Sequence, residues 1–159
     1  MENSSSKTAT PITGLFQMQT AFFNKAIDGI TTEDSTKRMN ENINHIAWLT
    51  GHIVSCRYML CGMLGVQVSE PYPELFGNLK TIQEDVTYPS LTELVNVLPE
   101  ITEQLISKLN SMSEEDFRKD AFGGKLIDIV LFFTYHEAYH IGQIGILRKA
   151  LGYEAIKHN

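Results

Sequence analysis

KLIDIVLFFTYHEAYHIGQIGILRKAL, residues 125–151, has an apolar spacing that predicts one long amphipathic helix. Gly123-Gly124 interrupts the chain just before it, and Gly152 follows its last apolar residue, as glycine commonly does at a helix end. Two histidines interrupt its otherwise apolar inner face. That face is expected to contain Ile129, Phe133, His136, His140, Ile144, Leu147 and Leu151.

Three further segments have the helical spacing of apolar residues, and strand-like alternation is poor throughout. Thr10-Pro11 predicts the start of the first helix, and Gly29 its end. Ser90 and Glu93 form the capping-box pattern that begins the third helix. The four helices are expected at about residues 10–29, 43–64, 90–109 and 125–151. They predict an all-α fold, a four-helix bundle with a long crossing connection between the second and third helices.

Length and composition predict one globular domain. The chain has 159 residues, of which 43% are hydrophobic and 20% charged, and this excludes a disordered chain or a disulfide scaffold. We expect the domain at residues 10–152, between a flexible N-terminal tail at 1–9 and a C-terminal tail at 153–159. The net charge of -6 argues against nonspecific nucleic-acid binding. No stretch approaches the ~20 apolar residues of a membrane span.

The cysteines and the N-terminal sequence predict a cytoplasmic protein. On one helix, Cys56 and Cys61 would be about 7.5 Å apart along the axis and point in different directions, which prevents a disulfide. Unpaired cysteines are typical of a reducing compartment. The N-terminus, MENSSSKTATPITG, lacks the apolar segment of a signal peptide.

Three histidines are candidate metal ligands. His136 and His140 are spaced i and i+4, so their imidazoles lie one turn apart on one helix face. A divalent transition metal needs such convergent nitrogens, at about 2.0–2.1 Å. His52 lies on the predicted inner face of the second helix and is the natural third ligand. Alternatively, these histidines are hydrogen-bonded core residues. Imidazole suits several transition metals, and zinc or nickel is the expected ion.

Neighbouring residues have two interpretations each. His45, two turns before His52, belongs to the surroundings of the metal pocket or faces solvent. Cys56, one turn after His52, is a soft ligand or a small buried hydrophobe. Trp48 is expected to pack around the site. His158, in the polar C-terminal tail, is not expected to take part.

The last helix also matches the pattern His-x-x-x-His with Glu137 in second place, as in zinc proteases, where the glutamate is the general base. Only 19 residues follow His140, and no sheet is predicted to orient a substrate, so proteolysis is not favoured. Glu137 is then a solvated charge, faces a partner subunit or lies at the edge of the metal pocket.

Three other polar residues of the last helix also have two interpretations. Asp128 orients a ligating imidazole or is a surface charge, and Gln143 lines the pocket or caps a backbone group. Arg148 contacts an anionic substrate or forms a salt bridge.

Two motifs together point to a known family. NHIAWLTGHI, residues 44–53, has a tryptophan four residues before a histidine, and HEAYHIGQI, residues 136–144, has the run His-x-x-x-His-x-Gly-Gln. Over about residues 12–152 the chain resembles the DinB-like (DinB/YfiT) superfamily. The resemblance implies an up-down-down-up bundle, frequent homodimers, and relatives that act on thiols such as bacillithiol, mycothiol or glutathione. It implies one divalent metal bound by His52, His136 and His140.

Two classes of function remain open. Three neutral ligands leave a coordination position for water or substrate, which is typical of a catalytic site. The first hypothesis is therefore a metal-dependent enzyme acting on a small molecule, either a low-molecular-weight thiol S-transferase or a hydrolase. The second is a non-enzymatic, dimeric metal-binding or stress-response bundle in which the metal is structural. The sequence assigns no catalytic residue.

Overall fold

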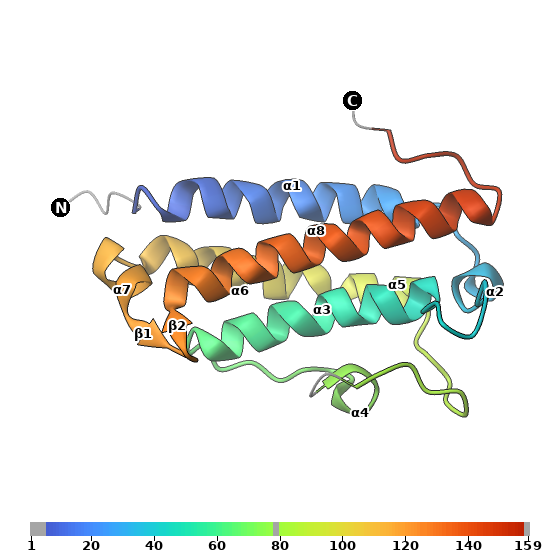
Figure 1. Cartoon of the computed structure of the whole chain (residues 1–159), viewed down its shortest axis with the longest axis horizontal. Helices are drawn as coiled ribbons and strands as arrows, with labels where there is room; N and C mark the ends of the chain where they lie inside the picture. The colour runs from blue at the N-terminus through green and yellow to red at the C-terminus, as the bar shows by residue number, and fades with distance from the viewer. Residues whose placement is uncertain (1–5, 78–79, 158–159) are drawn as a thin grey trace.

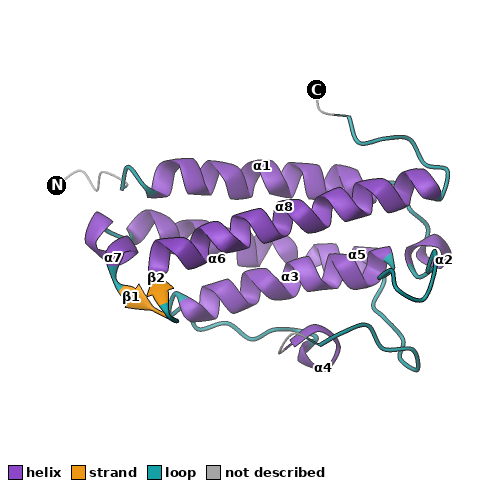
Figure 2. Ribbon diagram, viewed as in Figure 1, coloured by secondary structure: helices purple, strands orange, loops and turns teal. Residues whose placement is uncertain are grey.

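The computed structural model describes residues 6–77 and 80–157, and in this part the chain is mostly helical (Figure 1). The sheet in the same part is a hairpin of two-residue strands, β1 (Asp120–Ala121) and β2 (Gly124–Lys125) (Figure 2). The all-α class is confirmed. His158 lies outside the described residues. Every described helix is too short or too polar to cross a membrane.

Four long helices lie side by side. They are α1 (Ala9–Ile27), α3 (Ile46–Met63), α6 (Leu98–Ser111) and α8 (Leu126–Ala150). Helices α1 and α3 each pack against both α6 and α8, so the core lies among the four (Figure 1). The short helices are α2 (Thr32–Ser35), α4 (Pro73–Phe76), α5 (Leu91–Asn96) and α7 (Glu114–Arg118).

Helix α1 begins at Ala9, so the prediction that Thr10 is the N-cap and Pro11 the first helical residue is wrong. Thr8 precedes the first helical residue, and its backbone N–H donates to Oε1 of Glu114 over 3.0 Å. The Thr8 hydroxyl donates to Oε2 of the same carboxylate over 2.6 Å. Ser6, which is buried, also donates to Glu114. A carboxylate from α7 thus supplies an acceptor at this helix start, a long-range contact that local sequence cannot reveal.

The third predicted helix is divided into α5 and α6. Its capping box is confirmed, since the Glu93 N–H donates to Oγ of Ser90 over 3.2 Å and the Ser90 N–H donates to Oε2 of Glu93 over 2.8 Å. The interruption falls at Val97, just before Pro99 in the first turn of α6. Proline has no N–H to donate and is tolerated only at such a start.

The connection between α3 and α5 folds back onto α3 at Gly51. A Cβ on Gly51 would lie 2.0 Å from Cζ of Phe76, so only glycine allows the buried Phe76 ring of α4 to approach this closely. The contact lies next to His52 in the sequence.

Candidate metal centre

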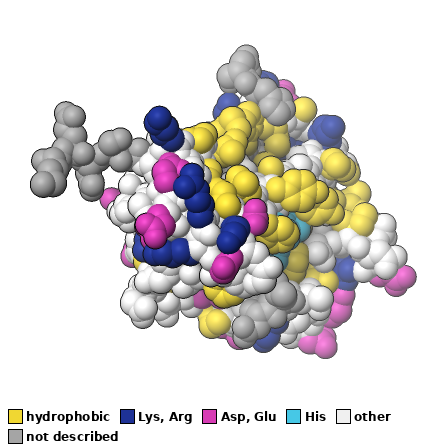
Figure 3. Space-filling model, turned by 60° about the vertical axis from the view of Figure 1, so that its left-hand side comes forward, with side chains coloured by type: hydrophobic (Ala, Val, Ile, Leu, Met, Phe, Trp, Pro, Cys, Tyr) yellow, Lys and Arg dark blue, Asp and Glu magenta, His cyan; other side chains and the backbone are white. Residues whose placement is uncertain are grey.

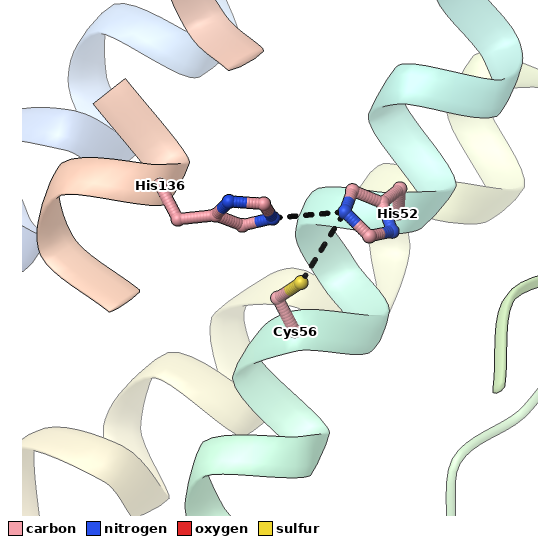
Figure 4. A group of neighbouring side chains, drawn as sticks. All are labelled: His52, Cys56 and His136. Carbon is pink, nitrogen blue, oxygen red and sulfur yellow. Dashed lines mark hydrogen bonds between the residues drawn. The ribbon is translucent and has the colours of Figure 1, made fainter. Parts of the chain in front are cut away.

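The structure brings together the three histidines that the sequence singled out. His52 projects from α3, and His136 and His140 project from α8. Nε2 of His136 lies 3.0 Å from Nε2 of His52 and 3.1 Å from Nε2 of His140. Figure 4 shows the rings of His52 and His136 pointing at each other across the gap between their helices.

Cys56 lies one turn after His52 on the same face of α3. Its Sγ is 3.6 Å from Nε2 of His52 (Figure 4). Among the described residues, His52, Cys56 and His136 form a group whose potential ligand atoms all lie within 4.8 Å of one another. Around a tetrahedral zinc ion, two imidazole nitrogens are about 3.3 Å apart, and a nitrogen and a thiolate sulfur about 3.6 Å apart. The spacings and the donor types therefore suit a transition metal.

Burial keeps the three imidazoles neutral, which is the form that binds metals. The pKa of His52 is lowered to about 4, mainly by burial and to a smaller extent by the neighbouring His140 and His136. Burial also lowers the pKa of His136 and of His140. The thiol of Cys56 is protonated at neutral pH, because burial raises its pKa to about 12.

Gln143 fixes the orientation of His140. Its Oε1 lies 2.6 Å from Nδ1 of His140, so the proton of the neutral ring belongs on Nδ1 and the Nε2 lone pair faces His136. Nε2 of Gln143 in turn donates to the Tyr139 hydroxyl over 3.2 Å. Outer contacts of this kind commonly set the tautomer of a metal-binding histidine. The sequence left two roles open for Gln143. The structure places its side chain beside the histidines, in contact with His140.

Aromatic rings hold the other two imidazoles. Trp48, one turn before His52, stacks on that ring with centroids 4.8 Å apart and planes 11° from parallel. Phe132, one turn before His136, stacks on that ring with centroids 5.3 Å apart. Trp48 is buried, as expected for a residue that packs around the site. Nδ1 of His52 has no hydrogen-bond partner among the described residues, so the cluster leaves one buried ring nitrogen unsatisfied.

A cavity of about 500 Å³ reaches this cluster between α3, α8 and the β1–β2 hairpin. Figure 3 shows histidine atoms at the margin of an apolar surface. A small molecule that enters the cavity would meet two of the three histidines, His52 and His136. The lining residues are His52, Cys56, Met59, Met63, Phe122, Gly123, Gly124, Asp128, Ile129, Phe132, Phe133 and His136.

Three polar residues have structural roles that the sequence did not predict. His45 is the N-cap of α3, where its Nδ1 accepts the N–H of Trp48 over 3.0 Å, so it is neither solvent-facing nor part of the cavity lining. Asp128 lines the cavity but also caps α8, accepting the N–H of Lys125 over 3.0 Å. Arg148 donates to backbone carbonyls at the end of α1 instead of forming a salt bridge.

The interpretation of Glu137 as a solvated charge is wrong. Its side chain is 3% exposed and forms an ion pair with Arg57, which is 1% exposed. Nε of Arg57 donates to Oε2 of Glu137 over 2.9 Å, and the guanidinium also contacts Thr102. Because this carboxylate is committed to a guanidinium, the structure gives it no general-base role. Arg57 was not identified from the sequence, although a lone arginine within the apolar α3 was the available signal.

A model of the DinB superfamily matches residues 15–144, which include all three histidines. No curated protein and no solved structure gives a significant match. The match covers most of the chain, and the motif residues on which the resemblance rested lie where a metal site would need them. The chain belongs to the DinB superfamily.

Proposed function

We propose that this protein is a metal-dependent enzyme that binds one divalent transition metal, zinc or nickel, through His52, His136 and His140. The reaction we propose is thiol S-transfer or hydrolysis of a small molecule. One observation carries the proposal: Nε2 of His136 lies 3.0 and 3.1 Å from Nε2 of the other two histidines, beside a cavity. A binding cluster with an accessible side is typical of a catalytic rather than a structural site.

A bound divalent cation supplies positive charge that makes a substrate thiol or a water molecule more acidic. The chain's own residues position the donors for this chemistry. Gln143 holds Nδ1 of His140, and Trp48 stacks on His52. Phe132 covers one face of His136 and lines the cavity, so it limits the access of water.

Cys56 favours a second candidate function, the non-enzymatic bundle with a structural metal. Its Sγ is close enough to His52 to complete a set of four protein ligands, and four protein ligands are typical of closed structural sites. The two functions differ in whether Cys56 is needed for metal binding. An open catalytic site requires only the histidines.

We further infer the arrangement around this site. The four long helices fit an up-down-down-up four-helix bundle in a cytoplasmic homodimer. Exposed apolar side chains on α1 and α8 support a dimer, since such patches commonly mark interfaces. They are Leu15, Met18, Leu131, Tyr135, Tyr139 and Ile146. Light scattering of the wild type and of Ile146→Glu tests this, with a dimer and a monomer expected.

The decisive experiment measures the metal content of untagged protein and its variants. We expect one equivalent in the wild type, almost none in His52→Ala or His136→Ala, and one equivalent in Cys56→Ala. Loss of the metal in Cys56→Ala favours the structural alternative. An empty wild type, even after reloading with zinc and nickel, contradicts both candidates. A thiol-transfer screen before and after chelation then tests for turnover that depends on the metal.

A further inference from the structure

The cavity beside the histidines has a polar end and a long apolar body. His52 and His136 lie at one end, and the hairpin residues Phe122, Gly123 and Gly124 lie at the other. Eight residues of α8 separate His136 from Asp128, which corresponds to about 12 Å along the helix axis. A ligand that reaches the histidines therefore also lies along these walls.

The body of the cavity is lined by apolar side chains. Met59 and Met63 contribute from α3, and Ile129, Phe132 and Phe133 contribute from α8. Phe132 is 54% exposed, so a ligand seated here would cover an apolar ring that now faces water. Methionine side chains adapt to ligands of different shape. The volume of about 500 Å³ lies within the range of small-molecule sites.

The body of the cavity, away from the proposed metal, is unsuited to an anion. Among the described residues that line it, none is a lysine or an arginine, and Asp128 contributes a negative charge. The Asp128 carboxylate accepts a hydrogen bond from the N–H of Lys125, and the Lys125 ammonium pairs with Asp120 outside the lining. A carboxylate that entered the body of the cavity would lose its hydration without gaining a partner.

We propose that this cavity takes an uncharged small molecule with an apolar body, whose polar head lies toward the histidines. The inference deepens the proposed function and relies on it for the metal at the inner end. It specifies the substrate class: an apolar thiol, or an apolar compound with a cleavable or electrophilic head. Thiols that carry carboxylates, such as glutathione, fit this cavity poorly.

The first test compares 1-hexanol with hexanoate, which share an apolar chain and differ in charge. Binding to the full chain, treated with a chelator, is followed by NMR of ¹³C-labelled methionine methyl groups. Met59 and Met63 report on this cavity, and Met18 reports on a separate apolar cavity between α1 and α8. We expect hexanol to shift Met59 and Met63 with at least tenfold higher affinity than hexanoate.

The length of the alkyl chain of the alcohol gives a second measurement on the same protein samples. From ethanol to hexanol, affinity should rise up to about fourfold per added methylene, the value for complete burial of each group. Equal affinity for hexanoate and hexanol, a lack of dependence on chain length, or shifts confined to Met18 would overturn the proposal.

Matched variants assign the effect to the cavity. Phe132→Ser should weaken hexanol binding about tenfold, whereas Tyr135→Ser, also an exposed aromatic of α8 but outside the lining, should leave it unchanged. Met63→Lys should raise the affinity for hexanoate at least tenfold, because it adds the missing cation, and Met18→Lys should not. If Phe132→Ser and Tyr135→Ser behave alike, the ligand does not occupy this cavity.

The metal-loaded protein separates this inference from the proposed function. With Co²⁺ bound, 1-hexanethiol should change the visible spectrum at a concentration at least tenfold lower than glutathione. If Co²⁺ does not bind but hexanol is still preferred over hexanoate, the proposed function fails and the cavity inference stands. If Co²⁺ binds and glutathione is the tighter ligand, the cavity inference fails and the metal site stands.

Discussion

Two polar clusters lie between α3 and α8, and they differ in whether their buried polar atoms all have hydrogen-bond partners. Arg57 and Glu137 form an ion pair in the closed core, with further hydrogen bonds from the guanidinium to Thr102 and to the carbonyl of Phe16. In the histidine cluster, one turn away on α3, Nδ1 of His52 lacks a partner among the described residues.

This difference indicates separate roles for the two clusters. A buried network of opposite charges that is fully hydrogen-bonded needs no ligand or ion, so its role is to hold α3 against α8. Neutral imidazoles whose Nε2 atoms converge beside a cavity gain most from a cation. The two clusters can be tested separately, because one should control the folding of the chain and the other its binding of metal.

The largest effect is expected from breaking the ion pair. Arg57→Ala should lower the free energy of unfolding by about 3–5 kcal/mol, because it leaves the Glu137 carboxylate buried without a partner. Urea denaturation measures this change. The double variant Arg57→Met/Glu137→Leu removes both charges and should be much less destabilised. A loss below about 1 kcal/mol in Arg57→Ala would show that water reaches the pair.

Removing the metal should have the next largest effect. If a cation binds the folded chain alone, a metal concentration of 100 times Kd stabilises it by about 2.7 kcal/mol. Thermal unfolding before and after chelation should therefore show a clear drop in Tm for the wild type. His136→Ala should unfold at the same temperature with and without the chelator. A chelator effect that persists in His136→Ala would place the metal elsewhere.

A smaller effect on metal binding is expected when the hydrogen bond that orients one metal-binding histidine, His140, is removed. Gln143→Ala leaves Nδ1 of His140 without the acceptor that fixes its tautomer, so metal affinity should fall about 10–100-fold. Competition with a chromophoric chelator measures the affinity. Gln104→Ala, a half-buried glutamine of α6 outside the cavity lining, is the matched control and should bind metal like the wild type. Equal affinities would assign Gln143 to packing alone.

The smallest effect is expected from a half-buried polar cluster, Glu114 with Ser6 and Thr8. Hydrogen bonds from Ser6 and Thr8 lower the pKa of Glu114 from its ordinary value of 4.5 to about 2. This stabilisation is present above pH 4.5 and is lost as the pH falls toward 2. The difference in Tm between the wild type and Glu114→Gln should shrink over that interval. Glu115→Gln, in the same turn, should show no such dependence.

Local sequence patterns predicted where the helices of this chain lie, but they did not predict the contacts between segments that are distant in the sequence. The spacing of His136 and His140 and the capping box at Ser90 are read within a few residues, and both predictions correspond to the structure. The Glu114 contact at the start of α1 joins segments more than 100 residues apart. No local pattern contains that information, and the first helix was therefore placed too late.

The site shows the same division. Helical spacing placed His52, His136 and His140 on inner faces, and the structure brings their rings together, while their role as metal ligands stays a prediction. Glu137 was assigned to solvent because it is charged and follows His136. Its burial depends on Arg57, a partner 80 residues earlier on another helix. Pairings between helices decide such cases, and periodicity within one helix does not reveal them.

The central claim is that one cation binds the three histidines, and X-ray absorption spectroscopy of zinc-loaded protein tests it most directly. We predict scattering from three imidazole rings with zinc–nitrogen distances of about 2.0–2.1 Å, reduced in His136→Ala. A sulfur shell at about 2.3 Å would add Cys56 to the ligands. A spectrum without imidazole scattering, or one unchanged in His136→Ala, would contradict the claim.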